Sequence, residues 1–257
     1  MAQSFFLPRA SGLHALYPLT KLVLVAALLL VGFIARSPQI PLALLLGAVL
    51  PLAAWGRIAG AVVRVTLLVA LPFVVSVTLI QGLFYPGPAH ILLAFGPLAF
   101  KAEGLALAFA TAARILLLAG AVLLLLFSTH PADLMLALEQ RGLPGAAAYI
   151  VVAAIQLLPQ LQARASAILD AQRSRGLETE GGMVTRARAL LPLVSPLVFS
   201  ALADVDERAM ALEARAFSTP RVKTSFKELR DTRGQALARG LLLVGGVVLA
   251  VLEVWRG

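Results

Sequence analysis

The chain carries one seven-residue pattern twice, as Ala171-Gln172-Arg173-Ser174-Arg175-Gly176-Leu177 and as Ala211-Leu212-Glu213-Ala214-Arg215-Ala216-Phe217. Each copy begins with Ala, places one Arg between two small residues, and ends in a large apolar side chain. Each also closes a long helical pattern, the first over residues 144–175 and the second over residues 185–216. Two matching helix ends of this kind predict a part of the chain that fits into two similar sockets.

The composition is typical of a membrane protein. Of the 257 residues, 60% are hydrophobic and 14% are charged, whereas a soluble domain carries about 25% charged residues. The chain has no Cys, which excludes disulfides, thiolate metal sites and a Cys nucleophile. Its three His residues are spread too widely to suggest a metal cluster. The net charge of +9 indicates basic cytoplasmic loops rather than nucleic-acid binding.

Apolar runs predict about five transmembrane helices, since about 20 apolar residues cross the hydrocarbon core of a bilayer. Four runs precede a long charged region and one follows it: 22–35, 41–54, 62–84, 104–127 and 237–255. We expect Thr20 to cap the first helix and Lys21 to extend toward the membrane interface. Residues 85–103 are rich in Gly and Pro and predict a loop, with a short re-entrant or interfacial piece over 91–100.

The charged region sets the orientation. Residues 129–235 hold 13 of the 22 Lys and Arg residues and 11 of the 13 Asp and Glu residues. Because basic loops are retained in the cytoplasm, we expect this region and the N-terminus to be cytoplasmic. The sequence therefore predicts an all-α membrane protein with three parts: transmembrane helices over 1–128, a cytoplasmic helical module over 129–235, and a last transmembrane helix over 236–257.

The cytoplasmic module is predicted to contain one short and two long amphipathic helices. Pro131 suits the first turn of the short helix, over 131–140, and Gly142 ends it. Each long helix joins an apolar half to a half with several charges, so we expect it to lie along the membrane surface or to pack under the bundle. Apolar positions of the two long helices include Leu157, Leu161, Ile168, Leu197 and Leu202.

Nothing in the sequence predicts an active site, a bound metal or a cofactor. The acidic run over 204–207 is the one candidate for a metal, but its neighbours Arg208 and Arg215 indicate a solvated, salt-bridged helix face. The chain lacks a G-x-x-x-x-G-K-[ST] loop, so it does not itself bind ATP in that manner.

Arg114 is unusual because it lies near the middle of the fourth apolar run. A cation at that depth faces the protein interior and needs a partner. It is either a buried structural charge or a residue on a substrate path, and we favour the structural charge. Backbone carbonyls, Thr111 or Ser76 are the candidate partners.

The repeated Arg residues suit docking into a partner. A cation in the last turn of a helix is favoured by the helix dipole, but that does not account for a pattern that recurs with small residues on both sides. Small flanking residues let a helix end enter a groove, and a guanidinium presents a planar fork of donors to a carboxylate or to several carbonyls. Leu177 and Phe217 would add an apolar anchor beside each fork.

These motifs resemble those of the transmembrane (T) component of energy-coupling factor (ECF) importers, along nearly the whole chain. The front stretch His14-Ala15-Leu16-Tyr17-Pro18-Leu19-Thr20-Lys21-Leu22 is similar to the family pattern His-x-Leu-Asp-Pro-Arg-Thr-Lys-Leu, from which Tyr17 and Leu19 depart. Arg114, Thr129-His130-Pro131, Leu138 and Gly142-Leu143-Pro144 follow in the expected order. The strongest match is the pair Ser174-Arg175-Gly176 and Ala214-Arg215-Ala216, where the family often has Gly at the last position.

The resemblance implies a hetero-assembly in a prokaryotic inner or plasma membrane. Two cytoplasmic ATP-binding-cassette (ABC) ATPases would each receive one helix end, Arg175 in one and Arg215 in the other. A separate membrane protein, the S component, would bind a vitamin or a transition metal and rest on the apolar side of the two helices. The chain itself would be a mechanical coupler without catalytic residues, cofactor or metal.

Two other classes of protein stay open at this point. The permease subunit of a conventional ABC importer also couples to ATPases, but it usually inserts one coupling helix per chain. A polytopic membrane enzyme would require an acidic or His cluster, which the sequence does not offer. The doubled Arg pattern favours the T component.

Overall fold

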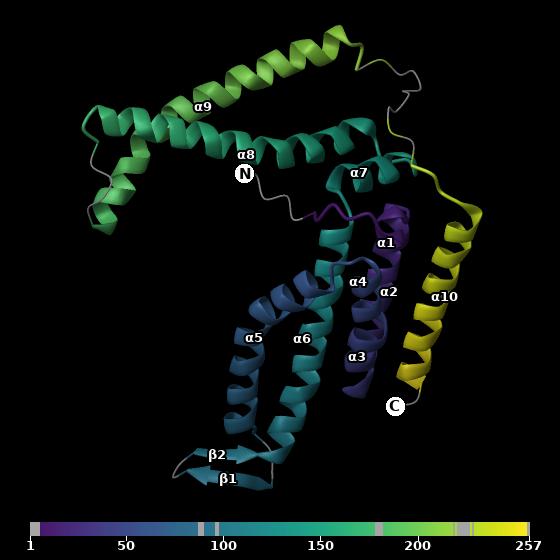
Figure 1. Ribbon diagram of the computed structural model, residues 1–257. Coiled ribbons are helices and arrows are strands. Elements are labelled where there is room, and N and C mark those ends of the chain that lie inside the picture. The colour runs from purple at the N-terminus through teal and green to yellow at the C-terminus, as the bar shows by residue number, and fades with distance from the viewer. Residues whose placement is uncertain are drawn as a thin grey trace. The chain divides into compact units, whose positions relative to one another are not determined.

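The computed structural model describes residues 6–86, 90–95, 98–177, 182–217, 219, 227 and 229–255. It forms two compact units (Figure 1). The first, which we call the membrane unit, combines Gln3–Leu143 with Leu229–Gly257. The second, which we call the inserted unit, comprises Pro144–Glu228.

The described part of the membrane unit is built mainly from helices, with one β-hairpin between two of them. They are α1 (Gly12–Ala15), α2 (Pro18–Ile34), α3 (Gln39–Leu44), the π-helical segment η1 (Leu45–Val49), α4 (Leu50–Trp55), α5 (Ala59–Phe84), α6 (Ala102–Ser128), α7 (Pro131–Glu139) and α10 (Arg233–Trp255). The segments α3, η1 and α4 form one apolar helix, Gln39–Trp55. Pro stands at the start of α2 and of α7, where its missing N–H removes no intrahelical hydrogen bond.

An all-α membrane protein with about five spans, as predicted from the sequence, is confirmed. The helices α5, α6, α8 (Gly145–Ser174) and α10 are long and apolar enough to cross a membrane, and two shorter apolar helices, Pro18–Ile34 and Gln39–Trp55, accompany them. Helix α8 meets this criterion by length and composition, although its sequence predicts a place in the cytoplasmic module. The first four predicted runs correspond to α2, to the helix from α3 to α4, to α5 and to α6, and the last corresponds to α10.

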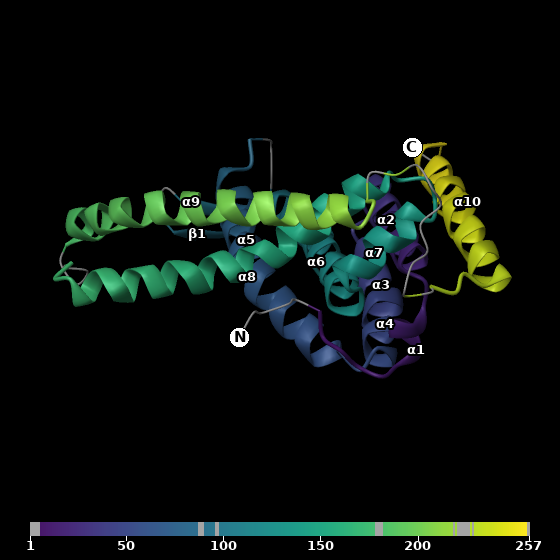
Figure 2. The same cartoon turned by 90° about the horizontal axis from the view of Figure 1, so that it is seen from above.

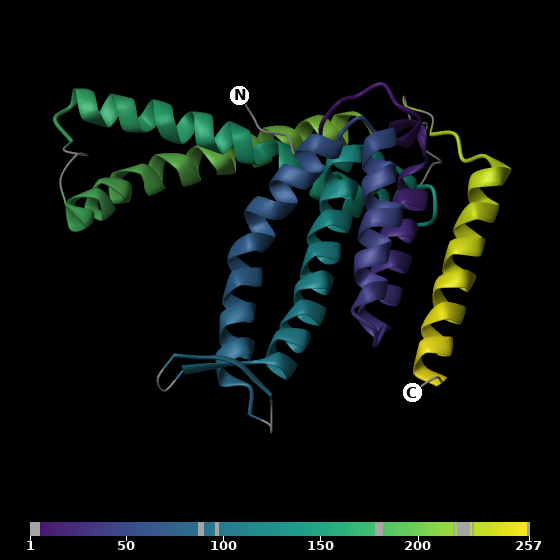
Figure 3. The same cartoon turned by 60° about the horizontal axis from the view of Figure 1, so that its bottom comes forward.

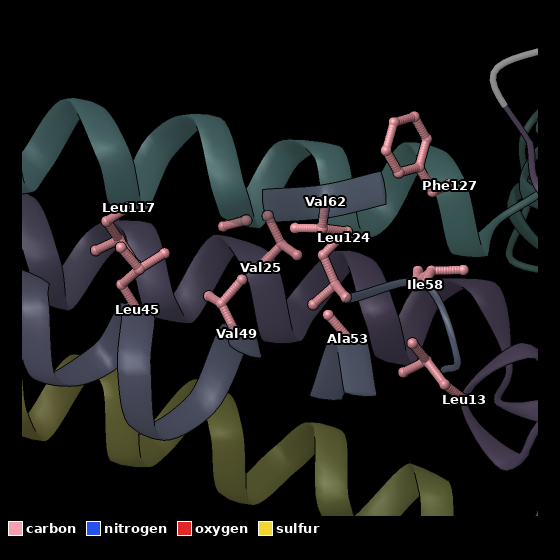
Figure 4. Packing of buried hydrophobic residues seen from close by; sticks show 11 residues of the cluster. Leu13, Val25, Leu45, Val49, Ala53, Ile58, Val62, Leu117, Leu124 and Phe127 are labelled. Atoms are coloured by element: carbon pink, nitrogen blue, oxygen red, sulfur yellow. The ribbon is translucent and has the colours of Figure 1, made fainter. Parts of the chain in front are cut away.

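The core of the membrane unit lies where α2, η1, α4, α5 and α6 meet (Figure 4). Leu117, on α6, is fully buried and lies against Gly32 of α2, where a Cβ atom would collide with the leucine side chain. The helices α5 and α6 lie side by side, and α10 packs against α2 (Figures 1 and 3). Buried members of this core are Leu13, Val25, Leu45, Val49, Ala53, Ile58, Val62, Leu117, Ala121, Leu124 and Phe127.

The segment between α5 and α6, predicted as a loop with a short re-entrant or interfacial piece, contains a β-hairpin. Strand β1 (Ile91–Phe95) pairs antiparallel with β2 (Leu98–Lys101). The pairing satisfies those backbone polar groups of the two strands that face each other. Lys101 Nζ donates to the Tyr85 carbonyl at 2.6 Å, and Glu103 accepts from His90 N at 3.0 Å, so both ends of the connection are tied.

Two cations join α2 and α6, one near each end of α2. At one end, Lys21 Nζ donates to the carbonyl of Ser128, the last residue of α6, at 2.7 Å. At the other, Arg114 Nη2 donates to the carbonyl of Ala35, which follows the last residue of α2, at 2.9 Å. Carbonyls at a helix C-terminus lack intrahelical partners and carry partial negative charge, so each cation satisfies one of them.

This arrangement corrects two predictions. Lys21 is 4% exposed and does not extend toward the interface, because its ammonium group is used inside the bundle. Thr20 does not cap α2, which begins at Pro18, and its hydroxyl instead accepts from Arg239 of α10 at 3.1 Å. For Arg114 a backbone carbonyl, one of the predicted candidates, is the partner.

The inserted unit consists of two long helices, α8 and α9 (Met183–Ala214), which run past each other (Figure 2). Both lie within about two residues of the predicted bounds. Pro159 lies inside α8, and Pro192 and Pro196 lie inside α9, where each removes one backbone hydrogen bond.

Candidate partner-docking site

Helices α8 and α9 are antiparallel and are held together by polar contacts near their middle. Arg164 of α8 forms an ion pair with Asp204 of α9 at 2.6 Å. One turn away on each helix, Arg208 Nη2 donates to Gln160 Oε1 at 2.7 Å. The hydrogen bond from Arg164 lowers the pKa of Asp204 below its usual value. No sequence pattern links residues so far apart, and these contacts were not predicted.

Both copies of the Arg pattern end their helices with the same backbone geometry. Arg175 is the C-cap of α8, with φ −92° and ψ 8°, and Arg215 is the C-cap of α9, with φ −92° and ψ 12°. The next residue is left-handed in both, with φ 90° at Gly176 and φ 57° at Ala216. The two caps are therefore structural as well as sequence repeats.

The hydrogen bonds identify both ends as Schellman motifs. In α8, Leu177 N donates to the Gln172 carbonyl at 3.0 Å and Gly176 N to the Arg173 carbonyl at 2.9 Å. In α9 the equivalent bonds run from Phe217 N to the Leu212 carbonyl and from Ala216 N to the Glu213 carbonyl, each at 2.9 Å. This motif needs a left-handed residue directly after the C-cap and commonly has an apolar residue next. A small residue at 176 and 216 thus has a local reason besides docking.

The two guanidinium groups are presented to solvent. Arg175 and Arg215 are exposed, and neither guanidinium makes a hydrogen bond or ion pair within the described ranges of the chain. Arg173, two residues earlier, differs because it pairs with Asp170 at 3.4 Å. Ser174 Oγ donates to the Asp170 carbonyl, so this small residue is also used locally. The guanidinium groups of the two C-cap Arg residues are therefore available to an external acceptor.

The two helix ends lie far apart along α8. The ring of Phe217 lies 5.4 Å from the ring of Tyr149, in the first two turns of α8, which places the end of α9 beside the start of α8. Arg175 follows the last residue of α8. Because α8 has 30 residues and a helix rises about 1.5 Å per residue, Arg175 and Arg215 are separated by about 40 Å.

The predicted apolar positions differ in exposure. Leu202 is 56% exposed, whereas Leu157, Leu161, Ile168 and Leu197 are half-buried. Other strongly exposed apolar side chains of the two helices were not singled out from the sequence, because the apolar stripe alone does not show which of its edges the partner helix covers. They include Ile155, Val194, Val198, Phe199, Val205 and Met210.

The described residues gather no group of three His, Asp or Glu side chains that could hold a metal ion. Within the acidic run over 204–207, Asp204 is engaged by Arg164 of the other helix rather than by a neighbour on its own helix. The arrangement therefore presents two exposed cationic helix ends and an apolar surface, which are features of binding to other proteins or to lipid.

Fold and site together define a multi-pass helical membrane protein with an inserted pair of antiparallel helices that expose matched Arg caps. A sequence profile of the CbiQ family, described as cobalt transport protein, matches residues 9–226. The chain is 30% identical to the energy-coupling factor transporter transmembrane protein EcfT of Thermanaerovibrio acidaminovorans, over 96% of this chain and 94% of the relative. It is 27% identical to the EcfT protein of Thermosediminibacter oceani, over 95% of both chains, and 28% identical to that of Limosilactobacillus fermentum, over 97% of this chain and 96% of the relative.

The chain therefore belongs to the CbiQ family and is a transmembrane component of an ECF transporter. The resemblance stated from the sequence motifs is confirmed. The relatives named here are bacterial transporter components, in agreement with a multi-pass membrane protein that acts in transport.

Proposed function

We propose that the chain transmits ATP-driven movement of two cytoplasmic ABC ATPases to a substrate-binding S component. Arg175 docks in one ATPase and Arg215 in the other. The observation that carries the proposal is the pair of matched C-caps, each with an exposed Arg that has no partner among the described residues. A separation of about 40 Å along α8 suits two sockets in two subunits rather than two contacts within one groove.

The geometry of the caps supports insertion into a groove. After each Arg the chain turns at a left-handed residue, so the helix ends there and the exposed Arg lies at its last turn. The planar fork can donate to a carboxylate or to several carbonyls of a socket at once. Leu177 and Phe217 are large apolar residues two positions after each Arg. Ser174 and Ala214 on the preceding side add little bulk.

The exposed apolar side chains of α8 and α9 form the second contact surface. Leu202, Val198 and Phe199 lie on α9 and Leu158 lies on α8, each at least half exposed. Such side chains on a charged helix pair suit the surface of another membrane protein or the lipid interface. We assign this surface to the S component, which selects the vitamin or transition metal. The predicted positions are half-buried, and we assign them to the less exposed part of the same surface: Leu157, Leu161, Ile168 and Leu197.

In this proposal ATP hydrolysis takes place in the partner ATPases, and the chain performs no chemistry. The inserted unit and the N-terminus are cytoplasmic, because residues 129–235 hold most of the basic side chains. Binding of ATP closes the two ATPases and moves both helix ends, and α8 and α9 carry that movement to the S component. Arg164 and Asp204 join the two helices near their middle, so neither can move freely without the other.

The test is a pull-down of the tagged full-length chain in mild detergent, followed by mass spectrometry. We expect two cassette ATPases and a small hydrophobic protein with the unsubstituted chain. Arg175→Ala and Arg215→Ala should each weaken ATPase retention, since a hydrogen bond to a charged group contributes about 1.5–3 kcal/mol. Losing one of two linked contacts should also lower the avidity of the complex.

Arg173→Ala is the matched control. It removes a cation from the same turn as Arg175, but that residue is paired with Asp170 and lies before the C-cap. Its ATPase retention should match that of the unsubstituted chain. Full retention of both ATPases by the Arg175→Ala/Arg215→Ala double variant would refute the proposed docking. If the chain is purified without partners even from fresh membranes, both Arg motifs are ordinary helix caps with no docking role.

A further inference from the structure

A cluster of polar side chains in the membrane unit is not used by the proposed docking. At its centre, Asp231 accepts two hydrogen bonds from the guanidinium of Arg239, at 3.0 and 2.6 Å. The same carboxylate accepts a third from Arg141 Nη2 at 2.7 Å. Arg239 belongs to α10, Asp231 lies just before that helix, and Arg141 lies just after α7.

A second set of contacts joins this centre to the start of α2. Arg239 Nη1 donates to Thr20 Oγ1 at 3.1 Å, and its guanidinium lies 5.2 Å from the centre of the Tyr17 ring. The Tyr17 hydroxyl donates to Gln140 Oε1 at 2.8 Å, and the Tyr17 backbone N–H donates to Gln235 Oε1 at 2.7 Å. We call these seven residues the junction cluster: Tyr17, Thr20, Gln140, Arg141, Asp231, Gln235 and Arg239.

The position of the cluster in the chain gives it a role. The inserted unit is Pro144–Glu228, so Arg141 lies just before the chain leaves the membrane unit and Asp231 just after it returns. The Arg141–Asp231 ion pair therefore joins the two segments that flank the inserted unit. Tyr17 and Thr20 hold both segments to α2 through Gln140, Gln235 and Arg239.

Packing of α10 does not require this arrangement. Away from the cluster α10 also packs against α2, where Gly246 lies beside Ala27. The Arg239–Asp231 ion pair is weak evidence for added stability because pairing the two charges also costs their desolvation. Arg239 is 8% exposed and Tyr17 3%, and the Arg239 guanidinium is held by Asp231 on one side and by Thr20 on the other. Arg141 lies at the edge of the cluster, with a side chain 54% exposed. Its ion pair with Asp231 joins the segment after α7 to the cluster.

We propose that the junction cluster is a permanently closed clamp. It holds the two segments that flank the inserted unit to α2, so movement of α8 and α9 reaches the membrane helices as movement of one rigid junction. Without the clamp, the same movement would separate the two segments and be lost within the chain. The driving movement rests on the proposed function, whereas the clamp itself is a property of this chain.

A distance measurement between spin labels tests the clamp, and the chain is suited to it because it has no Cys. Labels at Glu139→Cys, at the end of α7, and at Arg230→Cys, beside Asp231, report on the two flanking segments without replacing a cluster residue. The full-length chain is measured in lipid nanodiscs with its co-purified ATPases, with and without a non-hydrolysable ATP analogue. Asp231→Asn removes the central carboxylate, and Asp170→Asn makes the same chemical change to an exposed pair elsewhere.

With the cluster intact we expect one narrow distance distribution that the ATP analogue does not shift. Asp231→Asn should broaden the distribution and make it depend on nucleotide. If the cluster only helped α10 to pack against α2, the distribution would not depend on nucleotide. Asp170→Asn should behave like the intact chain. Arg141→Gln removes only the exposed ion pair with Asp231 and should broaden the distribution less. It replaces Asp231→Asn as the test if the Asp231→Asn variant does not elute as a folded protein.

Two results would overturn the clamp: a nucleotide-dependent distance in the intact chain, or a distribution in the clamp variant as narrow as that of Asp170→Asn. If no ATPase co-purifies, the proposed function fails. The nucleotide-free comparison of the Asp231 and Asp170 variants then still decides whether the clamp exists.

Discussion

Gly104→Ala should separate α5 from α6, the two longest helices of the membrane unit. At Gly104 a Cβ atom would overlap the Gln81 carbonyl oxygen and would lie 3.0 Å from the Gln81 carbonyl carbon and 3.1 Å from Tyr85 Cβ. The obstacle is mainly backbone, which cannot rotate away like the end of a flexible side chain. The two helices must therefore move apart, and small residues are used at such close approaches between membrane helices.

The size of the effect follows from two opposing terms. Overpacking of this kind costs about 1–3 kcal/mol. Replacing Gly by Ala inside a helix returns up to about 1 kcal/mol of helix propensity. Gly60→Ala is the matched control, because Gly60 also lies in the first turn of its helix, but a Cβ atom there would have no neighbour within 4 Å among the described residues. The difference between the two variants therefore isolates the packing term, about 1–3 kcal/mol.

The assay is unfolding of the purified full-length chain in mixed micelles with increasing denaturing detergent, followed by fluorescence of its two Trp residues. We expect Gly60→Ala to match or exceed the unsubstituted chain and Gly104→Ala to unfold at lower detergent fraction. Equal stability of the two variants would refute the close backbone contact between α5 and α6.

Three further predictions concern single groups. Arg114→Met should cost about 1.5–3 kcal/mol in the same unfolding assay, because it removes the charged donor to the Ala35 carbonyl; unchanged stability would contradict the role of Arg114 in joining α2 and α6. Ala216→Gly should stabilise the end of α9 by about 1 kcal/mol and Gly176→Ala should destabilise the end of α8 by a similar amount, since a left-handed Ala is strained. Hydrogen exchange at the two helix ends measures both changes, and the same sign for both would contradict the cap geometry. Hydrogen bonds from Arg239 and Arg141 lower the pKa of Asp231, so its contribution is complete above the unfolded value of about 3.9 and is lost as the pH falls through the lower folded pKa. Asp231→Asn should therefore narrow the difference in stability between neutral pH and about pH 3, and an unchanged difference would contradict the carboxylate form of the clamp.

The sequence was a good guide to helices and to their ends. Apolar runs predict α5, α6 and α10 because a helix that crosses a membrane must be apolar over its full length. Pro131 and Gly142 bound α7 because each has a backbone preference that operates locally. The two Arg motifs end α8 and α9 for the same reason.

Contacts between distant segments were not predictable in this way. Lys21 has the sequence context of an interfacial cation, and only the fold brings the free carbonyl of Ser128 to it. Asp231 and Arg239 are two charges near the start of an apolar helix, which by themselves indicate a solvated membrane boundary. Their partners Tyr17 and Arg141 lie far away in the chain. Tyr17 stands where the family pattern has Asp, and its ring lies 5.2 Å from the guanidinium of Arg239, which pairs with Asp231.

One physical rule separates the structural cations of this chain from those assigned to docking. Lys21 and Arg114 each donate to a carbonyl at the end of another helix inside the membrane unit. Arg175 and Arg215 also lie at helix C-termini, but the Schellman hydrogen bonds satisfy the local carbonyls with backbone N–H groups. Their guanidinium groups are therefore not needed by the helices they end. An exposed cation that its own fold does not use is available for a partner, and the chain provides this arrangement twice, at opposite ends of one helix pair.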